Sequence, residues 1–304
     1  MRVNRRALLA IGLGTAAIQP WHVAVPQLIG RIKKTIPSTG EQLTPVGLGT
    51  NRYGVSASSA GMAELRAALA RFHALGGQLI DTAQEYGRAE GNIGNLSHEL
   101  GINDDLFIGT KIRTFGREAG IRSIEQSFER LRRTHIDLAQ IHDLTDYSTH
   151  IETLRELKAE GRVRYIGITA SRHGYAAEME RLMRTDDLDF VQLSYSLDER
   201  RAAERLLPTA IDRGIAVIVN RPFSSGSLFR KLRDHPLPDW VAEIDCSSWG
   251  QFILKYIVSH PAVTCAVPGT RREDHVVDNL GAAYGQLPDA ALRTRQEQFF
   301  DDIA

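Results

Sequence analysis

The strongest constraint on the fold of this chain is a series of eight short apolar segments of strand type. They lie at residues 46–50, 78–83, 106–111, 136–142, 164–169, 190–195, 215–220 and 263–268. Stretches with the 3.6-residue hydrophobic period of amphipathic helices separate them. Eight strand–helix units over about 240 residues predict an α/β fold of one domain, a closed (β/α)8 TIM barrel.

The glycine pattern after the first predicted strand argues against an open, doubly wound sheet. Such sheets bind dinucleotides at a G-x-G-x-x-G turn that leads directly into a helix. The segment GLGTNRYG at residues 47–54 lacks this spacing and precedes a loop. The helix pattern at residues 63–77 fits a barrel unit, because Leu65, Leu69 and Phe72 share one face and Gly76 follows as a C-cap.

Composition narrows the functional classes. Hydrophobic residues make up 42% and charged residues 24% of the 304 residues, which excludes long disorder and a membrane protein of several spans. Lys plus Arg and Asp plus Glu both number 37, so no basic excess favours a nucleic-acid partner. The two cysteines, Cys246 and Cys265, are too few for a disulfide framework or a zinc cluster, and we expect no metal.

The N-terminus differs from the rest of the chain. Arg5 and Arg6 precede a modestly apolar run at residues 7–18, which is too short for an ordinary membrane-spanning helix. This pattern resembles a twin-arginine export signal, although Asn4 stands where Ser or Thr is usual. We therefore divide the chain into a leader-like segment, 1–36, and a barrel, 37–304. The expected location is the periplasm, and the alternative is a cytoplasmic protein with an N-terminal extension.

Four chemically distinct side chains follow or end three consecutive predicted strands. They are Asp81, Tyr86, Lys111 and His142. Neighbouring strands lie about 4.8 Å apart, and catalytic residues of barrels gather at the C-terminal strand ends. Singly, each has a structural explanation: a turn residue, a packed ring, a solvated strand end or a hydrogen-bonded neutral imidazole. Their occurrence in register favours a shared catalytic site.

The chain resembles the aldo-keto reductase family from about residue 43 to the last helix. The most specific segments are LIDTAQEYG at 79–87, FIGTKIR at 107–113 and IDLAQIHD at 136–143. The resemblance implies a catalytic tetrad of Asp81, Tyr86, Lys111 and His142. It also implies NAD(P)H-dependent reduction of a small aldehyde or ketone to an alcohol.

The chemistry of these side chains agrees with those roles. A free phenol has a pKa near 10, and a neighbouring ammonium lowers it. We expect Asp81 to hold Lys111 charged beside Tyr86, so that Tyr86 can donate a proton. His142 would hydrogen-bond the carbonyl oxygen, and a nicotinamide would supply the hydride because no side chain can.

The resemblance also implies a cofactor groove along the top of the barrel. Gln192 would contact the carboxamide. Thr169 and Ala170 stand at the family's Ser-Asn pair, where Thr169 keeps the hydroxyl and Ala170 lacks the amide. Asn220 stands where many members have a tyrosine that stacks on the nicotinamide. Either the nearby Arg221 guanidinium takes this role, or the stacking is absent. The remaining cofactor candidates lie at the end of the first predicted strand and in a later segment, a loop that leads into a helix: Gly49, Thr50, Gly269, Thr270, Arg271, Arg272, His275, Asp278 and Asn279.

The loop at residues 269–272 decides which cofactor we expect. Gly269 and Thr270 precede a helix N-terminus, which is a ready anion site. Arg271 or Arg272 would pair with a 2′-phosphate, so we expect NADPH, with NADH as the alternative. Asp278 and Asn279 match the family pair that contacts adenine.

Two other readings of the same residues stay open. One is a non-catalytic or regulatory barrel that binds nucleotide and a partner protein. The other is a Schiff-base aldolase that uses Lys111. For the substrate pocket we expect a fairly open site lined by Tyr53, Phe115 and Leu144, which follow the first, third and fourth predicted strands.

Overall fold

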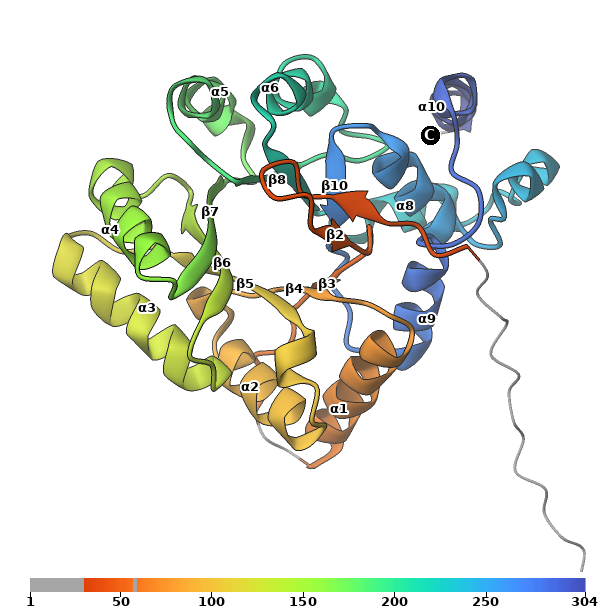
Figure 1. Ribbon diagram of the computed structural model, residues 1–304. Helices are drawn as coiled ribbons and strands as arrows, with labels where there is room; N and C mark the ends of the chain where they lie inside the picture. The colour runs from red at the N-terminus through yellow and green to blue at the C-terminus, as the bar shows by residue number, and fades with distance from the viewer. Residues whose placement is uncertain (1–29, 57–58, 304) are drawn as a thin grey trace, which may run out of the picture.

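Eight parallel strands form the centre of the protein in a computed structural model that describes residues 30–56 and 59–303. Their spatial order is their order in the chain (Figure 1), so the predicted (β/α)8 barrel is confirmed. The strands are β3 Leu48–Gly49, β4 Leu79–Asp81, β5 Phe107–Ile112, β6 Ile136–His142, β7 Val163–Thr169, β8 Phe190–Ser194, β9 Ala216–Asn220 and β10 Val263–Ala266.

The barrel closes between its first and last strands. Isolated parallel bridges pair Val46 with Ala266 and Gly49 with Gly269 across this seam. The seam is tight, because a Cβ atom on Gly49 would lie 2.8 Å from the Val267 carbonyl oxygen. A residue without a side chain is therefore needed where β3 approaches the chain beyond β10.

Alternation along the strands sorts their side chains between the barrel interior and the helices. Interior side chains form one buried cluster that includes Leu79, Phe107, Leu138, Tyr165, Phe190, Ile218 and Cys265. The residues that follow most of them point outward into the larger core under the helices, among them Ile80, Ile108, Ala139, Ile166 and Val191.

A short antiparallel hairpin precedes the barrel. Its strands are β1 Lys34–Thr35 and β2 Gln42–Leu43, and they pair Lys34 with Leu43. Ile36 and Leu43 are fully or almost fully buried in the interior cluster, so the hairpin helps to fill the barrel. The described chain is therefore packed against the barrel from before residue 37, where we placed the start of the domain.

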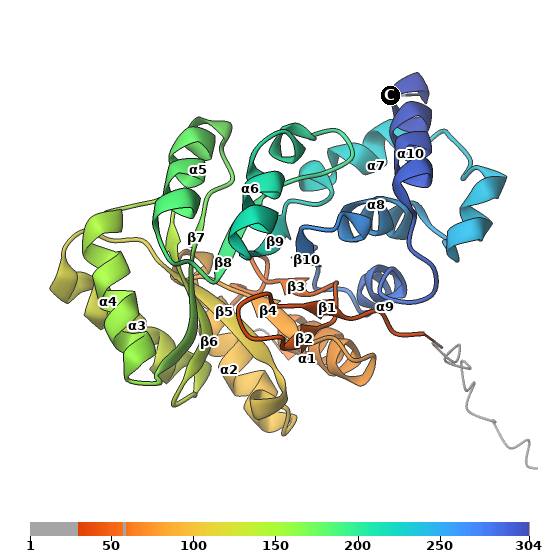
Figure 2. The same ribbon diagram turned by 45° about the horizontal axis from the view of Figure 1, so that its top comes forward.

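The helices surround the strands, as Figures 1 and 2 show from two directions. In α1 the predicted residues Leu65, Leu69 and Phe72 are buried, and Gly76 adopts the left-handed φ of +78° expected of a C-cap. The helices are α1 Ser59–Ala74, α2 Ala89–Glu99, α3 Arg117–Leu131, α4 Tyr147–Ala159, α5 Ala176–Thr185, α6 Leu206–Arg213, α7 Ser227–Leu232, α8 Trp249–Ser259, α9 Glu273–Gly281 and α10 Ala290–Ile303.

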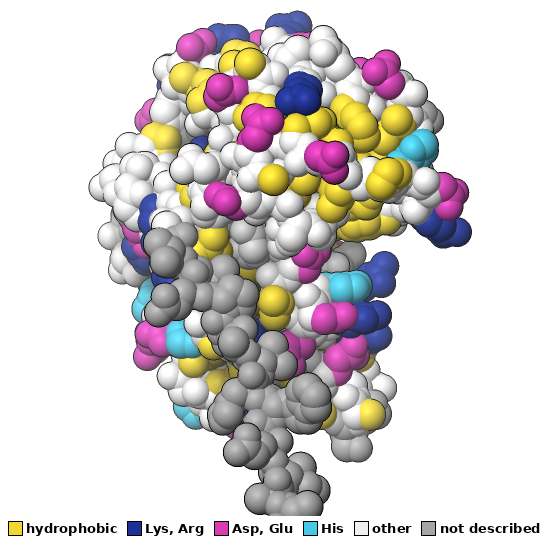
Figure 3. Space-filling view, turned by 90° about the vertical axis from the view of Figure 1, so that its right-hand side faces the viewer, with side chains coloured by type: hydrophobic (Ala, Val, Ile, Leu, Met, Phe, Trp, Pro, Cys, Tyr) yellow, Lys and Arg dark blue, Asp and Glu magenta, His cyan; other side chains and the backbone are white. Residues whose placement is uncertain are grey.

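One face of the molecule carries a gathering of apolar side chains. In Figure 3 hydrophobic side chains gather in the upper part, with acidic and basic side chains among them, and a group of acidic, basic and histidine side chains lies below. None of the described helices combines the length and the apolar character needed to cross a bilayer. Within residues 30–56 and 59–303, no group of three or more His, Cys, Asp or Glu side chains is arranged to hold a metal ion.

Candidate active site

A buried ion pair joins the ends of β4 and β5. Lys111 Nζ lies 2.7 Å from Asp81 Oδ1 and donates a second hydrogen bond of 2.7 Å to the Thr82 carbonyl. Burial lowers the pKa of Lys111, but the charges of Asp81 and Tyr86 outweigh burial and hold that pKa above its ordinary value. The lysine is thus a charged ammonium inside the barrel mouth.

Tyr86 stands over this ammonium. It ends a 3₁₀ turn, Gln84–Tyr86, that follows β4, and Lys111 Nζ lies 5.3 Å from the centre of its ring. Lys111 lowers the pKa of Tyr86, as expected. Burial together with the Asp81 and Glu85 carboxylates raises that pKa further than the lysine lowers it, so the net shift is upward. The phenol is therefore less acidic than a free tyrosine. Our expectation of a more acidic phenol was wrong because it left out burial and the two carboxylates.

His142 ends β6 and contacts a carboxylate that the sequence analysis did not select. Its Nδ1 lies 3.4 Å from Glu85 Oε2. This approach falls short of hydrogen-bond geometry, and Nδ1 is buried without a hydrogen-bond partner among the described residues. Next to this contact, Arg113, which follows β5, and Asp143, which follows β6, form an ion pair of 3.1 Å. The structure therefore brings Asp81, Lys111 and Tyr86 together directly and connects His142 to the turn that carries Tyr86.

A pocket of about 560 Å³ lies across the seam of the barrel at the C-terminal strand ends. Asp81 and Tyr86 line it, which places the predicted proton donor in its wall. Most of the predicted cofactor residues line it as well: Gly49, Thr50, Arg221, Gly269, Thr270, Arg271, Arg272, His275, Asp278 and Asn279. This volume lies within the range of about 300–1,000 Å³ that is usual for small-molecule sites.

Thr169 and Gln192 do not line this pocket. Both are buried, and they are partners in the register of β7 and β8. The Gln192 Oε1 atom accepts a hydrogen bond of 2.9 Å from Gln140 Nε2. Gln192 is therefore partly satisfied by the barrel itself.

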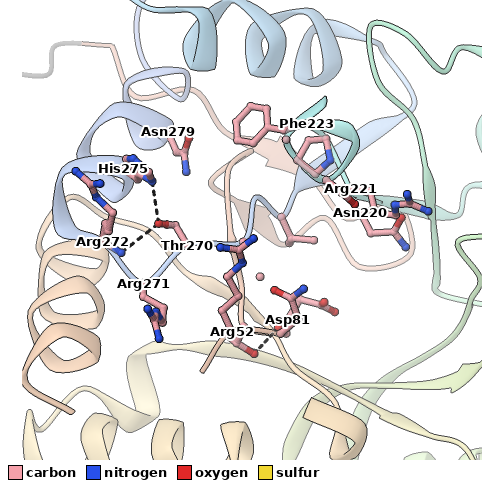
Figure 4. A pocket seen from close by; sticks show the side chains of 18 of the residues that line it. Arg52, Asp81, Asn220, Arg221, Phe223, Thr270, Arg271, Arg272, His275 and Asn279 are labelled. Carbon is pink, nitrogen blue, oxygen red and sulfur yellow. Dashed lines mark hydrogen bonds between the residues drawn. The ribbon is translucent and has the colours of Figure 1, made fainter. Parts of the chain in front are cut away.

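The loop before α9 forms one side of the pocket. Figure 4 shows Thr270, Arg271, Arg272 and His275 on this side, with Asn220 and Arg221 opposite and Arg52 near Asp81. The Thr270 hydroxyl accepts a hydrogen bond of 3.1 Å from the Arg272 backbone N–H and lies 3.3 Å from His275 Nδ1.

The two arginines of this loop have different surroundings. Arg271 approaches Glu64, another lining residue, at 3.6 Å. Arg272 pairs with Asp274 at 2.5 Å, where both side chains are exposed. The Arg271–Glu64 pair therefore links the loop before α9 to α1. The helix N-terminus and both guanidinium groups make this end suited to an anion.

Some residues lie elsewhere than expected. Tyr53 is fully buried in the core, the Phe115 side chain is 78% exposed, and neither of them nor Leu144 lines the pocket. The expectation for Tyr53 was therefore wrong, whereas the roles of Phe115 and Leu144 stay predictions. Arg52 lines the pocket instead, and its position just after GLGT, at the end of a strand, was the signal available in the sequence.

The sequence model of the aldo/keto reductase family matches residues 45–297. The chain belongs to the aldo/keto reductase family. Together with relatives named as reductases or oxidoreductases and a neighbour solved in complex with NADPH, this membership places the chain among the NAD(P)H-dependent oxidoreductases.

Individual relatives are more distant. Aldo-keto reductase YhdN of Bacillus subtilis is 28% identical over 220 residues, which cover 66% of this chain and 64% of YhdN. The match thus spans slightly less than two thirds of that relative. The uncharacterized oxidoreductase YqkF of the same bacterium is 24% identical and covers 89% of this chain and 97% of its own.

Solved structures share the fold. An aldo-keto reductase from Klebsiella pneumoniae in complex with NADPH superposes with a TM-score of 0.75 and is 25% identical. The match covers 88% of this chain and 95% of that chain.

Proposed function

We propose that this protein reduces a small aldehyde or ketone to the alcohol with NADPH, and that Tyr86 donates the proton. The carrying observation is the buried Lys111–Asp81 pair beneath Tyr86. Asp81 and Tyr86 line a pocket that most of the predicted nucleotide residues line as well. The NADPH complex of the Klebsiella relative supports the choice of cofactor.

The residues of the chain fit an elongated anionic cofactor. At one end of the pocket, Arg271, Arg272 and the N-terminus of α9 supply positive charge and backbone donors. Asp81 and Tyr86 line the same pocket. When bound, the nicotinamide supplies the hydride for reduction.

The chain's own groups would then manage the carbonyl oxygen. Tyr86, with its pKa held above the ordinary value, keeps its proton at neutral pH. The developing alkoxide takes this proton, and Lys111 stabilises the phenolate that remains. Asp81 holds Lys111 in place at 2.7 Å throughout. His142 orients the carbonyl oxygen from the neighbouring strand end.

Turnover with a panel of aldehydes and ketones tests this proposal. NADPH should be oxidised by the purified protein, and Tyr86→Phe should lose about 10²- to 10⁴-fold in rate, the usual contribution of a general acid. Nucleotide affinity should survive in the variant. Binding of NADPH without turnover by the wild type would instead support the regulatory barrel.

We further propose that the protein is exported by the twin-arginine route to the periplasm. The support is the sequence alone: Arg5 and Arg6 before an apolar run, all outside the described residues. Fractionation of cells that express the native chain and an Arg5→Lys, Arg6→Lys variant provides the test. Export of the native chain and retention of the variant are expected, whereas cytoplasmic retention of both full-length forms would reject the signal.

A further inference from the structure

Glu85 links the two proposed participants in carbonyl reduction. It immediately precedes Tyr86 on the 3₁₀ turn after β4, and its carboxylate reaches His142 at the end of β6. The separation of Glu85 Oε2 from His142 Nδ1 is 3.4 Å, and the Glu85 side chain keeps 32% of its surface exposed. One turn thus carries both the proton donor and a charged neighbour of the histidine.

The two nitrogens of the His142 ring have different surroundings. Nδ1 is closed off from solvent and has no hydrogen-bond partner among the described residues. Nε2 has no such partner either but is not among the buried unpaired atoms. An unpaired buried nitrogen is costly, and the carboxylate nearest to Nδ1 is an acceptor that needs only a small movement to pair with it.

This arrangement restricts the ring because hydrogen bonds have direction. A neutral imidazole carries one N–H, whereas the protonated ring carries two. If Nδ1–H is donated to Glu85, a neutral ring presents only a lone pair at Nε2. The protonated ring can donate from Nδ1 to Glu85 and from Nε2 to a carbonyl oxygen at the same time.

Among the described residues, Glu85 is the carboxylate within 4.0 Å of the ring nitrogens, and the other charged groups nearby are paired with one another. On β4 and β5, Asp81 and Lys111 neutralise each other at 2.7 Å. Arg113 and Asp143 pair at 3.1 Å beside them.

The remaining neighbours are uncharged or already described. Tyr86 lies on the same turn as Glu85, and Thr169 is the uncharged register partner of His142 on β7. Partial burial raises the pKa of Glu85, but His142 and Arg113 outweigh burial and hold it below its ordinary value. The carboxylate is therefore ionised at neutral pH.

We infer that Glu85 is a positioning residue that keeps His142 doubly protonated, with Nδ1 toward Glu85 and Nε2 toward the substrate carbonyl. The inference rests on the proposed reductase function. It adds a residue of this chain to that site. The proton delivered to the alkoxide still comes from Tyr86, and His142 contributes a charge-assisted hydrogen bond that strengthens as negative charge develops.

The test combines kinetics with nitrogen NMR on Glu85→Gln. In protein labelled with ¹⁵N-histidine, the His142 signal is assigned by its absence from His142→Gln. At neutral pH a smaller share of this ring should carry both protons in Glu85→Gln than in the wild type, since an opposite charge at this distance favours the protonated ring. We expect kcat to fall about 10- to 100-fold, with the onset of its loss moved to lower pH and the KM for NADPH unchanged.

Two further variants control for folding and for general effects of charge. Glu85→Asp keeps the charge on a shorter side chain. It should recover part of the rate and part of the doubly protonated share of His142. Glu199→Gln removes the carboxylate of another pair, at 2.9 Å from His173 Nε2, and should leave kcat unchanged.

The outcomes separate this inference from the reductase proposal. If folded Glu85→Gln has the same share of doubly protonated His142 as the wild type, the inference is overturned, whether or not kcat falls. If that share falls in the variant but the wild type does not turn over, the reductase proposal is rejected and only the Glu85–His142 pair is supported.

Discussion

Lys111 Nζ and Asp81 Oδ1 form an ion pair of 2.7 Å in which the side chains are only 2% and 6% exposed. Neither partner can be removed without leaving the other charge in an environment that water does not reach. Removal of one member of a buried pair costs about 3–5 kcal/mol. The pair at the centre of the site is therefore also a determinant of the stability of the barrel.

We predict that Lys111→Met lowers the free energy of unfolding by about 3–5 kcal/mol. The double variant Lys111→Met, Asp81→Asn should regain part of this loss, because it no longer leaves an unpaired carboxylate. Urea unfolding measures both. Neither variant should reduce carbonyls, and equal stabilities for the two would contradict the argument.

The same substitution should change the ionisation of Tyr86. Lys111 is the largest influence that lowers the pKa of this phenol, while burial, Asp81 and Glu85 raise it. Without the lysine, the pKa of Tyr86 should rise further above its ordinary value, so phenolate should appear only at higher pH than in the wild type. Ultraviolet difference titration against Tyr86→Phe, Lys111→Met isolates this ring. A phenolate signal at unchanged pH would remove Lys111 from the mechanism.

Replacement of Arg271 and Arg272 by Ala should weaken NADPH binding and leave NADH binding nearly unchanged. Hydrogen bonds to charged groups contribute about 1.5–3 kcal/mol, or roughly 10- to 100-fold in Kd. Fluorescence titration of both nucleotides checks this. Arg66→Ala is the control, because it removes an exposed ion pair between Arg66 of α1 and Glu99 of α2. Equal losses for both nucleotides would mean that the arginines do not contact the 2′-phosphate.

Gly49→Ala should destabilise the barrel by about 1–3 kcal/mol, because the added carbon would overpack the seam. Its ideal position is 2.8 Å from the Val267 carbonyl oxygen, which is backbone and cannot rotate away. Gly91→Ala in α2 is the matched control, since its Cβ would meet no atom within 4 Å. That variant should gain about 0.5–1 kcal/mol. The prediction fails if the two substitutions change thermal stability alike.

Leu43→Ala tests the hairpin inside the barrel. Leu43 is 1% exposed and packs with the interior cluster, so its truncation should cost about 2–5 kcal/mol. Ile211→Ala, at a side chain that is 52% exposed, should change stability by less than about 0.5 kcal/mol. Chemical denaturation of both compares them. A loss at Leu43 no larger than at Ile211 would show that the hairpin is dispensable.

Strand-end residues could be predicted because hydrophobic periodicity locates the ends of strands. Asp81, Lys111 and His142 were found in this way, and each lies at or within one residue of the C-terminal end of its strand. Glu85 was missed because its contact with His142 crosses from a turn to a strand two positions away. Sequence spacing does not give the direction of such a side chain.

The burial of Tyr53 could not be predicted for a similar reason. Tyr53 and Phe115 both follow strands, yet one turns into the core and the other into solvent. The sign of the Tyr86 pKa shift depends on burial and on two carboxylates acting against one lysine. Such sums require distances, which the order of residues does not contain.

The seam between the first and last strands makes nucleotide capture a checkpoint for completed folding. Asp81 and Tyr86 belong to the early part of the chain, whereas Gly269, Arg271 and Asn279 come after the last strand. A chain interrupted before β10 would contain every predicted catalytic residue and still lack one wall of the pocket. A ligand that contacts both walls would bind only to the closed barrel, so its binding would show that the first and last strands are paired.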